Sequence, residues 1–266
     1  MNTSGRALRI LQITDCHLGR TGHSSLLGMD TRASFDSVLE LVKQNYPEPD
    51  LVLATGDIGQ DGSVEAYRYF QDKMSVFSCP VFWFAGNHDN FPAMLEVAGS
   101  RGALEKTFAS GPWQLIFLNS AVPGKVHGFL RPKELSLLNR TLKATPDKFA
   151  LIAFHHHPID TDCQWLNPIG LRNREAFFAT IDRYPQVRGV VWGHVHQEMD
   201  QRRGDVRLLA APSTCIQFEP RSREFGVGRE SPGYRWLELH PDGRIETGVV
   251  RADHIEFEVD MNSGGY

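Results

Sequence analysis

The stretch LVLATGD at residues 51–57 decides how this chain folds. Its apolar run Leu51–Ala54 reads as a buried β-strand, and Gly56 and Asp57 end the run with a turn and a carboxylate. Four other motifs follow apolar runs in the same way and carry polar side chains. Because parallel strands end at one edge of a sheet, we expect these side chains to meet there as a dinuclear metal site. In chain order the five motifs are Asp15-Cys16-His17, Gly56-Asp57, Gly86-Asn87-His88-Asp89, His155-His156-His157-Pro158 and Gly193-His194-Val195-His196.

Short apolar strands alternate with amphipathic helices along the chain. The helix expected at 31–44 has Phe35, Val38 and Val42 on one face at helical spacing. Such alternation predicts an α/β fold with buried parallel strands, and two sheets packed face to face inside helices would accommodate both halves of the chain. The expected strands are Leu8–Ile13, Leu51–Ala54, 81–85, 113–119, 149–154, Val187–Trp192, 206–211, 234–239 and 245–250, and the expected helices are 31–44, 63–78, 132–143 and 172–184.

The composition limits the kinds of partner. The 266 residues are 41% hydrophobic, so we expect a single domain over 1–266, with a loose tail at about 255–266. A net charge of -4 indicates no overall basic surface, which argues against nucleic acid or an anionic membrane and favours a small-molecule substrate. The short polar start of the chain and the interruption of the first apolar run at Asp15 predict neither a secretory signal nor a membrane span.

The four cysteines, Cys16, Cys79, Cys163 and Cys215, have no CxxC spacing. Without an export signal, we expect them to be reduced thiols in a cytoplasmic protein. Cys16 and Cys215 lie beside functional segments, where small buried residues are more common than nucleophiles. The chain has no GxSxG elbow and no GxxxxGK[ST] loop, which argues against a serine hydrolase and against a P-loop nucleotide-binding protein.

Two of the motifs carry potential ligands at alternate positions. On an extended segment, residues i and i+2 point to the same side, so Asp15 and His17 would share one face, and so would His194 and His196. One such pair is a weak signal, but the ordered combination of all five motifs is very hard to obtain by accident. Carboxylate and imidazole ligands suit iron, manganese or zinc, and the absence of cysteine ligands argues against a structural zinc site.

The order and spacing of the motifs resemble the calcineurin-like metallophosphoesterases over about residues 8–218. The resemblance implies a four-layer αββα sandwich of two mixed β-sheets flanked by helices. It also implies two metal ions, iron or manganese or both, with zinc as a further option. By the same resemblance, the first metal would be held by Asp15, His17 and His196, the second by Asn87, His155 and His194, and Asp57 would bridge both.

The three consecutive histidines leave the register of one ligand open. We favour His155 because it comes first after its strand, as the family's ligand does. His156 and His157 would then support the ligand or face the substrate, and His156 is our candidate for a substrate contact.

The residues after the third strand carry the expected catalytic groups. By resemblance, His88 is the general acid or charge stabiliser beside the leaving oxygen, and Asn87 donates a hydrogen bond to the phosphoryl oxygen. Both are therefore expected to contact the substrate. Asp89 either orients His88 or caps the helix that follows. The glycines of the motifs would allow sharp turns near a crowded centre, or they are ordinary turn glycines.

Segments outside the metal motifs are most similar to the bacterial class III 3′,5′-cyclic-AMP phosphodiesterases. This similarity implies hydrolysis of cyclic AMP to 5′-AMP by a hydroxide that bridges the two metals. Trp165 and the residues 171–173 belong to it, in a loop that either reaches over the active site or packs a helix start. The other similar segments are 25–28, 55–61, 211–218 and 232–239.

Two alternatives stay open. A glycerophosphodiesterase-like or broad-specificity phosphodiesterase would use the same ligands. A non-catalytic, metal-binding regulatory protein is a different class, but such proteins tend to lose ligands, and here every position is filled. We expect a monomer or homodimer that acts on a cyclic nucleotide.

Overall fold

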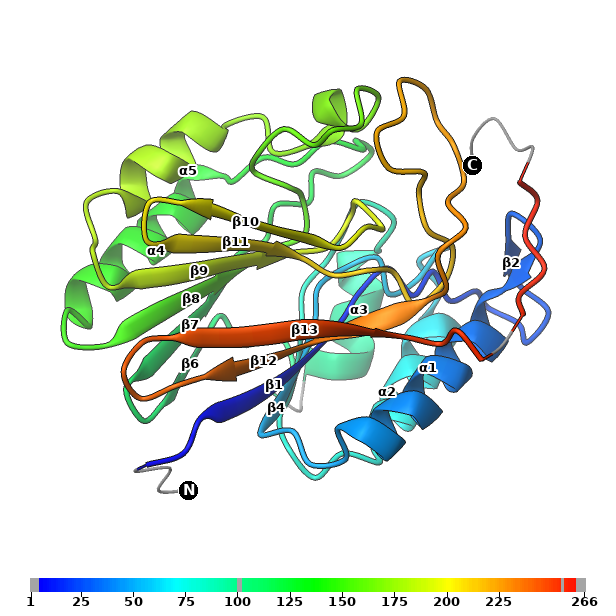
Figure 1. Ribbon diagram of the computed structural model, residues 1–266, viewed down its shortest axis with the longest axis horizontal. Helices are drawn as coiled ribbons and strands as arrows, with labels where there is room; N and C mark the ends of the chain where they lie inside the picture. The colour runs from blue at the N-terminus through cyan, green and yellow to red at the C-terminus, as the bar shows by residue number, and fades with distance from the viewer. Residues whose placement is uncertain (1–4, 100–101, 255, 262–266) are drawn as a thin grey trace.

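Two mixed β-sheets lie face to face between two layers of helices (Figure 1). The computed structural model describes residues 5–99, 102–254 and 256–261. The four-layer α/β architecture expected from the sequence is confirmed. Within the described ranges, no helix combines the length and apolar character needed to cross a membrane.

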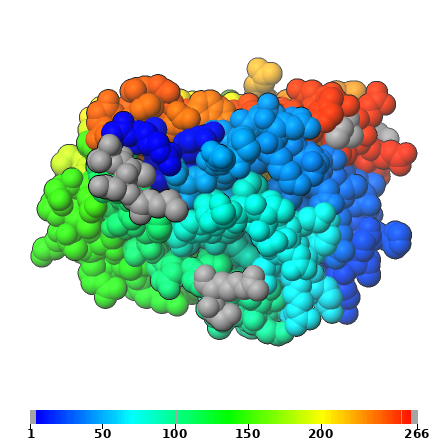
Figure 2. Space-filling model, turned by 90° about the horizontal axis from the view of Figure 1, so that it is seen from below, coloured from blue at the N-terminus to red at the C-terminus, as the bar shows by residue number. Residues whose placement is uncertain are grey.

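Sheet 1 has five strands in the order β13-β12-β1-β4-β5. Its parallel core consists of β1 (Leu8–Ile13), β4 (Leu51–Ala54) and β5 (Val81–Trp83). The hairpin β12 (Gly233–Leu239) and β13 (Ile245–Arg251) pairs antiparallel with β1. In Figure 2 the start of the described chain, in dark blue, lies beside the orange segment, in agreement with the pairing of β1 with β12. The carboxyl-terminal part of the chain thereby completes the sheet that the first strands begin.

Sheet 2 has six strands in the order β10-β11-β9-β8-β7-β6. Its four central strands are parallel, and β6 and β10 add antiparallel edges. Neither edge strand was expected, because β10 is exposed along four of its five residues and has no apolar run. The strands are β6 (Thr107–Ser110), β7 (Trp113–Phe117), β8 (Phe149–Ala153), β9 (Val187–Trp192), β10 (Met199–Arg203) and β11 (Val206–Ala210).

Helices cover the outer face of each sheet. The apolar stripe of α1 is buried against sheet 1, as its spacing predicts, and Asp30 caps the helix by accepting from two backbone N–H groups. The helix expected at 63–78 is shorter, because Ser63 is its N-cap and it ends at Met74 with Ser75 as its C-cap. The elements are α1 (Thr31–Asn45), α2 (Val64–Met74) and α3 (Phe91–Ala98) on sheet 1, α4 (Pro132–Ala144) and α5 (Arg174–Ile181) on sheet 2, and the short elements β2 (Ser25–Leu26), β3 (Met29–Asp30) and η2 (Asn167–Ile169).

The expectation of a loose tail at about 255–266 falls partly on residues outside the described ranges. Within 256–261, Asp260 N–H donates a hydrogen bond to Leu27 O at 2.7 Å. Phe257 and Val259 are half-buried against the hydrophobic core. This part of the tail is therefore fixed to the turn between β2 and β3.

An apolar core and several polar links join the sheets; two of the links are buried side chains, Gln12 and Arg235. Ile10 and Leu53 from sheet 1 pack with Leu151 from sheet 2. Gln12 Nε2 donates to Trp192 O across the interface at 2.9 Å.

The second link is Arg235 of β12, which is 1% exposed. It donates to the carbonyl oxygen of Ala210 at 2.9 and 3.1 Å and to that of Met199 at 3.1 Å, and also to Thr247 Oγ1 at 3.0 Å. Burial lowers its pKa to about 10, so the guanidinium is still charged at neutral pH. Arg235 thus satisfies carbonyls of β10 and β11, the last two strands at one side of sheet 2.

Arg235→Met should lower the free energy of unfolding by about 2 to 5 kcal/mol, because two buried carbonyls lose their donors. Arg68→Met is the control: Arg68 forms an exposed ion pair with Glu96, and its loss should cost less than about 1 kcal/mol. Urea denaturation of both variants measures the difference. Equal losses would contradict the role of Arg235 as a link between the sheets.

Candidate metal centre

The expected ligands lie at the edge of the sandwich where five parallel strands end. β1, β4 and β5 are parallel in sheet 1, and β8 and β9 are parallel in sheet 2. Each motif follows one of these strands. Carboxylates from sheet 1 therefore meet imidazoles from sheet 2, as ligands do at the carboxyl ends of such strands.

Left-handed backbone, rather than strand alternation, aims these side chains. β1 ends at Ile13 and β9 ends at Trp192, so both ligand pairs lie beyond extended structure. The argument from alternate positions of a strand is therefore wrong for both pairs. Left-handed backbone is uncommon for residues with a Cβ atom, and it concentrates at functional sites. Five expected ligands have it: Asp15 (φ 52°), His17 (φ 46°), Asp57 (φ 48°), His194 (φ 69°) and His196 (φ 47°).

Backbone hydrogen bonds join the loops that follow β1 and β4. Asp15 N–H donates to Gly56 O at 3.0 Å, and His17 N–H donates to Asp57 O at 2.9 Å. Gly56 has a φ of 97°, and a Cβ atom there would lie 2.4 Å from Nδ1 of His155. Gly56 is therefore needed both for its conformation and for the close approach of an imidazole.

Two other motif glycines allow close approach alone. A Cβ atom at Gly86 would lie 2.1 Å from Oδ1 of Asp57, and one at Gly193 would lie 2.7 Å from Oδ2 of Asp15. Both glycines thus leave the space that a carboxylate occupies.

The Asp57 carboxylate lies in the middle of the cluster. Its Oδ2 is 3.2 Å from Nε2 of His155 and 3.9 Å from Nε2 of His17, and its Oδ1 accepts from His88 N–H at 2.8 Å. Burial acts to raise the pKa of Asp57, but the charge on His155 above all holds it well below its usual range. Asp57 also raises the pKa of His155 to about 9, against the effect of burial. Asp57 is thus an anion that faces ligands from both sheets.

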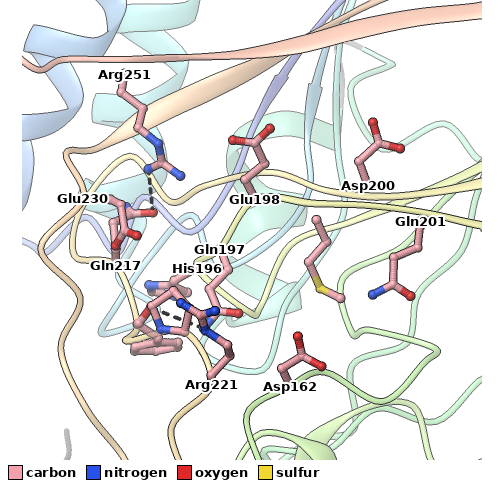
Figure 3. Close-up of a pocket in the computed structure, with 13 residues that line it drawn as sticks. Asp162, His196, Gln197, Glu198, Asp200, Gln201, Gln217, Arg221, Glu230 and Arg251 are labelled. Atoms are coloured by element: carbon pink, nitrogen blue, oxygen red, sulfur yellow. Dashed lines mark hydrogen bonds between the residues drawn. The ribbon is translucent and has the colours of Figure 1, made fainter.

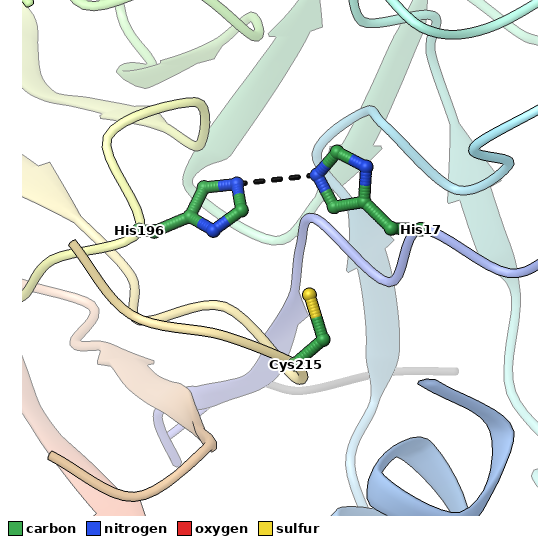
Figure 4. Close-up of side chains that lie close together, drawn as sticks. All are labelled: His17, His196 and Cys215. Atoms are coloured by element: carbon green, nitrogen blue, oxygen red, sulfur yellow. Dashed lines mark hydrogen bonds between the residues drawn. The ribbon is translucent and has the colours of Figure 1, made fainter. Parts of the chain in front are cut away.

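One group of ligands surrounds His17 and His196 (Figure 4). Their Nε2 atoms are 3.2 Å apart, and Nε2 of His196 is 3.4 Å from Oδ1 of Asp15. Cys215 lies in the same group, but burial raises the pKa of its thiol to about 12. The thiol also donates to the backbone carbonyl of Asp15, with Sγ 3.3 Å from the oxygen, so we take the imidazoles and the carboxylate as the ligands for a cation.

A second group surrounds His155. Its Nε2 is 3.2 Å from Oδ1 of Asn87, and its ring centroid is 5.0 Å from that of His194. The backbone N–H of His194 donates to both carboxylate oxygens of Asp15, at 3.1 and 3.0 Å, and so connects the two groups. Nε2 of His194 lies 3.1 Å from Ile169 O, which leaves Nδ1 for a metal.

The hydrogen bonds behind the imidazoles fit metal ions in front of them. Nδ1 of His155 lies 2.8 Å from Thr55 O, and Nδ1 of His196 lies 2.8 Å from Ile216 O. A carbonyl oxygen requires the N–H at Nδ1, so in the neutral imidazole, which is the form that binds a metal, the lone pair is on Nε2 and faces the cluster. Lone pairs and carboxylates that converge in this way suit cations.

Gln60 has a role in this cluster that sequence reasoning missed. Its Oε1 is 2.5 Å from Nδ1 of His17. The side chain of Gln60 therefore accepts the N–H at Nδ1 of His17, as backbone carbonyls do for His155 and His196. The Gln60 N–H also donates to Leu18 O at 2.9 Å, which fixes the loop against the first motif. The only sequence signal was its position three residues after Asp57 in a segment already noted for its similarity.

The geometry distinguishes the three histidines at 155–157. A ring nitrogen of His155 lies 3.2 Å from Asp57 and from Asn87. The two ring nitrogens of His156 lie 2.8 Å from Ser120 Oγ and 3.0 Å from Val126 O. One nitrogen of His156 also lies within 4.8 Å of ligand atoms of His155 and His194, but in this arrangement both of its nitrogens are engaged by the surrounding loops.

The third histidine, His157, is 2% exposed and stacks on His194, with ring centroids 5.5 Å apart. This packing gives it a supporting place behind a ligand.

His88 is half-buried, and its ring meets that of His17 edge-on, with centroids 4.9 Å apart. Asp89 fits neither expected role. Its carboxylate accepts from the N–H groups of Gly59 and Gly86 and from the Tyr67 hydroxyl, at 2.9, 2.9 and 3.0 Å. Asp89 therefore joins the loops after β4 and β5.

The cap of α3 is Asn90, whose side chain accepts from Ala93 N–H. Farther from the ligands, Phe218 stacks on His196 at 4.2 Å, and Trp165 packs edge-on against Phe218 at 4.9 Å. Trp165 thus supports the face of a ligand. Asn173 precedes α5 and exchanges two hydrogen bonds with the backbone of Leu130, which is the packing alternative for that segment.

Comparison with known proteins agrees with this geometry. The chain is 46% identical over 257 residues to the 3′,5′-cyclic adenosine monophosphate phosphodiesterase CpdA of Pseudomonas aeruginosa, covering 97% of this chain and 94% of that protein. It is 42% identical over 265 residues to the Vibrio vulnificus protein of the same name, covering 99% and 97%. A dimetal phosphatase from Danio rerio shares the fold, with a TM-score of 0.61 at 16% identity over 93% of this chain and all of that one.

Residues 8–198 match the family described as calcineurin-like phosphoesterase. This range includes all five motifs and the strands that end at them. The chain therefore belongs to the calcineurin-like phosphoesterase family.

Proposed function

We propose that this chain is a dinuclear-metal phosphodiesterase that hydrolyses 3′,5′-cyclic AMP to 5′-AMP. The observation that carries the proposal is the complete ligand set, gathered from both sheets around the buried carboxylate of Asp57. The substrate is supported by the names of the relatives, which match nearly the whole chain.

The proposed ligands form two overlapping sets that share Asp57. Iron, manganese or both are the proposed metals, with zinc as the alternative, because the donors are imidazole, carboxylate and amide groups. When bound, two such ions supply an activated water and neutralise the charge of the phosphate. The first metal is assigned to Asp15, His17 and His196, and the second to Asn87, His155 and His194.

The remaining steps fall to residues beside the ligands. As the oxygen of water bonds to phosphorus and the P–O3′ bond breaks, His88 would donate a proton to the departing O3′ atom, which leaves the 5′-monophosphate. General acids of this kind contribute a factor of about 10² to 10⁴. The amide N–H₂ group of Asn87 is on the side away from the oxygen that faces His155, where it can donate to a phosphoryl oxygen. His156 holds the loops through Ser120 and Val126 and is assigned no substrate contact.

The alternatives are weaker but testable. The same ligands would serve a glycerophosphodiesterase-like or broad-specificity enzyme, which only a substrate comparison separates. A non-catalytic role fits poorly with a centre that has every ligand position and His88 filled. We also propose a cytoplasmic location, which the four free cysteines support. A monomer or homodimer remains our prediction for the oligomeric state.

Protein loaded with manganese or iron should convert 3′,5′-cyclic AMP to 5′-AMP and show little phosphomonoesterase activity. Chromatography of the products is the measurement. If 3′-AMP is the main product, O3′ is not the leaving atom that faces His88. No turnover of cyclic AMP, together with rapid cleavage of glycerophosphodiesters, would favour the alternative enzyme.

His155→Ala should weaken binding of the second metal more than His156→Ala does, because only Nε2 of His155 faces Asp57 and Asn87. A metal titration followed by calorimetry measures the affinity of each variant, and the loss of a ligand should lower this affinity more than the loss of a supporting contact. The opposite order of affinities would move the ligand to His156.

Gln60→Leu should weaken binding at the first metal site by about 10- to 100-fold, because the imidazole of His17 loses the acceptor that fixes its tautomer. Gln60→Glu keeps an acceptor and should stay closer to the wild type. The measurement is competition for metal against a chelator, with Gln201→Leu on the exposed strand β10 as control. If Gln60→Leu binds metal as tightly as the wild type, Gln60 does not orient His17 for metal binding.

A further inference from the structure

Two cavities border residues of the metal centre, on different sides. One, of about 460 Å³, borders His196 (Figure 3). The other, of about 540 Å³, borders Asn87 and lies among α3, the loop after β7 and the start of α4. We call it the Asn87 groove. A substrate whose phosphate lies at the metals could extend into either cavity, so their linings decide between them.

The charge of the linings favours the Asn87 groove for an anionic substrate. The cavity beside His196 offers no excess of positive charge, because its lining has four carboxylates and two guanidinium groups. The Asn87 groove has three cationic side chains, Lys106, Arg131 and Lys133, against the carboxylates of Glu134 and Asp89. Since the whole chain has a net charge of -4, this groove is a local positive region.

The ion pairs and hydrogen bonds of the charged side chains in the Asn87 groove leave two of its cations available to a ligand. Lys106 lies 3.6 Å from Glu134, and Asp89 is saturated by the hydrogen bonds of two loops. Arg131 and Lys133 have no ion pair with any described residue. They stand at the start of α4, whose N-cap residue, Arg131, makes no side-chain cap bond, so the positive end of the helix dipole adds to the field.

The walls of the groove suit a flat, partly apolar group. Phe91 and Pro92 come from the start of α3, and Val122 and Pro123 come from the loop after β7. Phe91 is 40% exposed, so part of its side chain is open to a ligand. An aromatic ring of a ligand can stack on an aromatic side chain, and such base stacking tolerates different bases.

The deepest polar groups supply a hydrogen-bonding edge. Glu134 is 4% exposed and accepts from Asn119 N–H at 2.9 Å, and Lys106 lies beside it. Oδ1 of Asn119 accepts from Ala121 N–H, which leaves its amide N–H₂ group as a donor. An ammonium and an amide donor next to a carboxylate match the mixed donors and acceptors on the edge of a nucleobase.

We propose that the Asn87 groove binds the nucleoside part of the cyclic nucleotide, with the base against Phe91 and its polar edge toward Lys106, Asn119 and Glu134. The inference rests on the proposed phosphodiesterase function and names the subsite that selects its substrate. Asn87 joins the two regions, because it borders the groove and lies 3.2 Å from His155.

The test compares two diesters, cyclic AMP and methyl 4-nitrophenyl phosphate, which has no nucleoside. Phe91→Ala should raise KM for cyclic AMP about five- to tenfold, the loss typical of one aromatic contact, and change kcat less than about twofold. Both parameters for the small diester should stay at wild-type values. Val122→Ser, in the loop after β7, should act in the same direction. Leu95→Ala is the matched control, because Leu95 is exposed on α3 and does not line the groove.

Inhibition by adenosine tests the groove without requiring turnover of cyclic AMP. It should inhibit hydrolysis of the small diester by the wild type, and more weakly in Phe91→Ala. An unchanged KM for cyclic AMP in both groove variants, or equal inhibition by adenosine in wild type and Phe91→Ala, would overturn the assignment. Failure of the wild type to hydrolyse cyclic AMP would instead contradict the proposed function, and the adenosine result would still decide the groove.

Discussion

The rest of the candidate metal centre depends on the buried carboxylate of Asp57. Two imidazoles and a backbone N–H from three separate loops converge on it, and the loops come from both sheets. A buried anion of this kind is costly unless positive charge or donors surround it. Without a metal, the folded chain meets that demand with His155 and with the backbone N–H of His88. A cation bound between the carboxylate and the neutral imidazoles would meet the same demand.

The geometry of the backbone follows from this crowding. Asp57 and its neighbours adopt left-handed conformations, and Gly56 and Gly86 leave the space that His155 and Asp57 occupy. Side chains behind the ligands then set their orientation, Gln60 for His17 and Phe218 for His196. Precision at such a site comes from these supporting residues as much as from the ligands.

Much of the fold could be predicted from the sequence, because its buried parallel strands are continuous apolar runs. The strand β10 could not, since Met199–Arg203 is a polar edge strand without apolar periodicity. The motifs indicated which residues would gather, but the left-handed backbone that aims Asp15 depends on tertiary hydrogen bonds to Gly56. The role of Gln60 could not be predicted because its partner, His17, is distant in sequence. The Asn87 groove could not be predicted because the segments that line it are also far apart in the chain.

Anomalous X-ray diffraction from crystals of manganese-loaded protein would show whether two cations share Asp57. We expect two manganese peaks on either side of the Asp57 carboxylate, one beside His17 and His196 and the other beside His155 and Asn87. A single ion, or ions bound at His156 and His157 away from Asp57, would contradict this expectation.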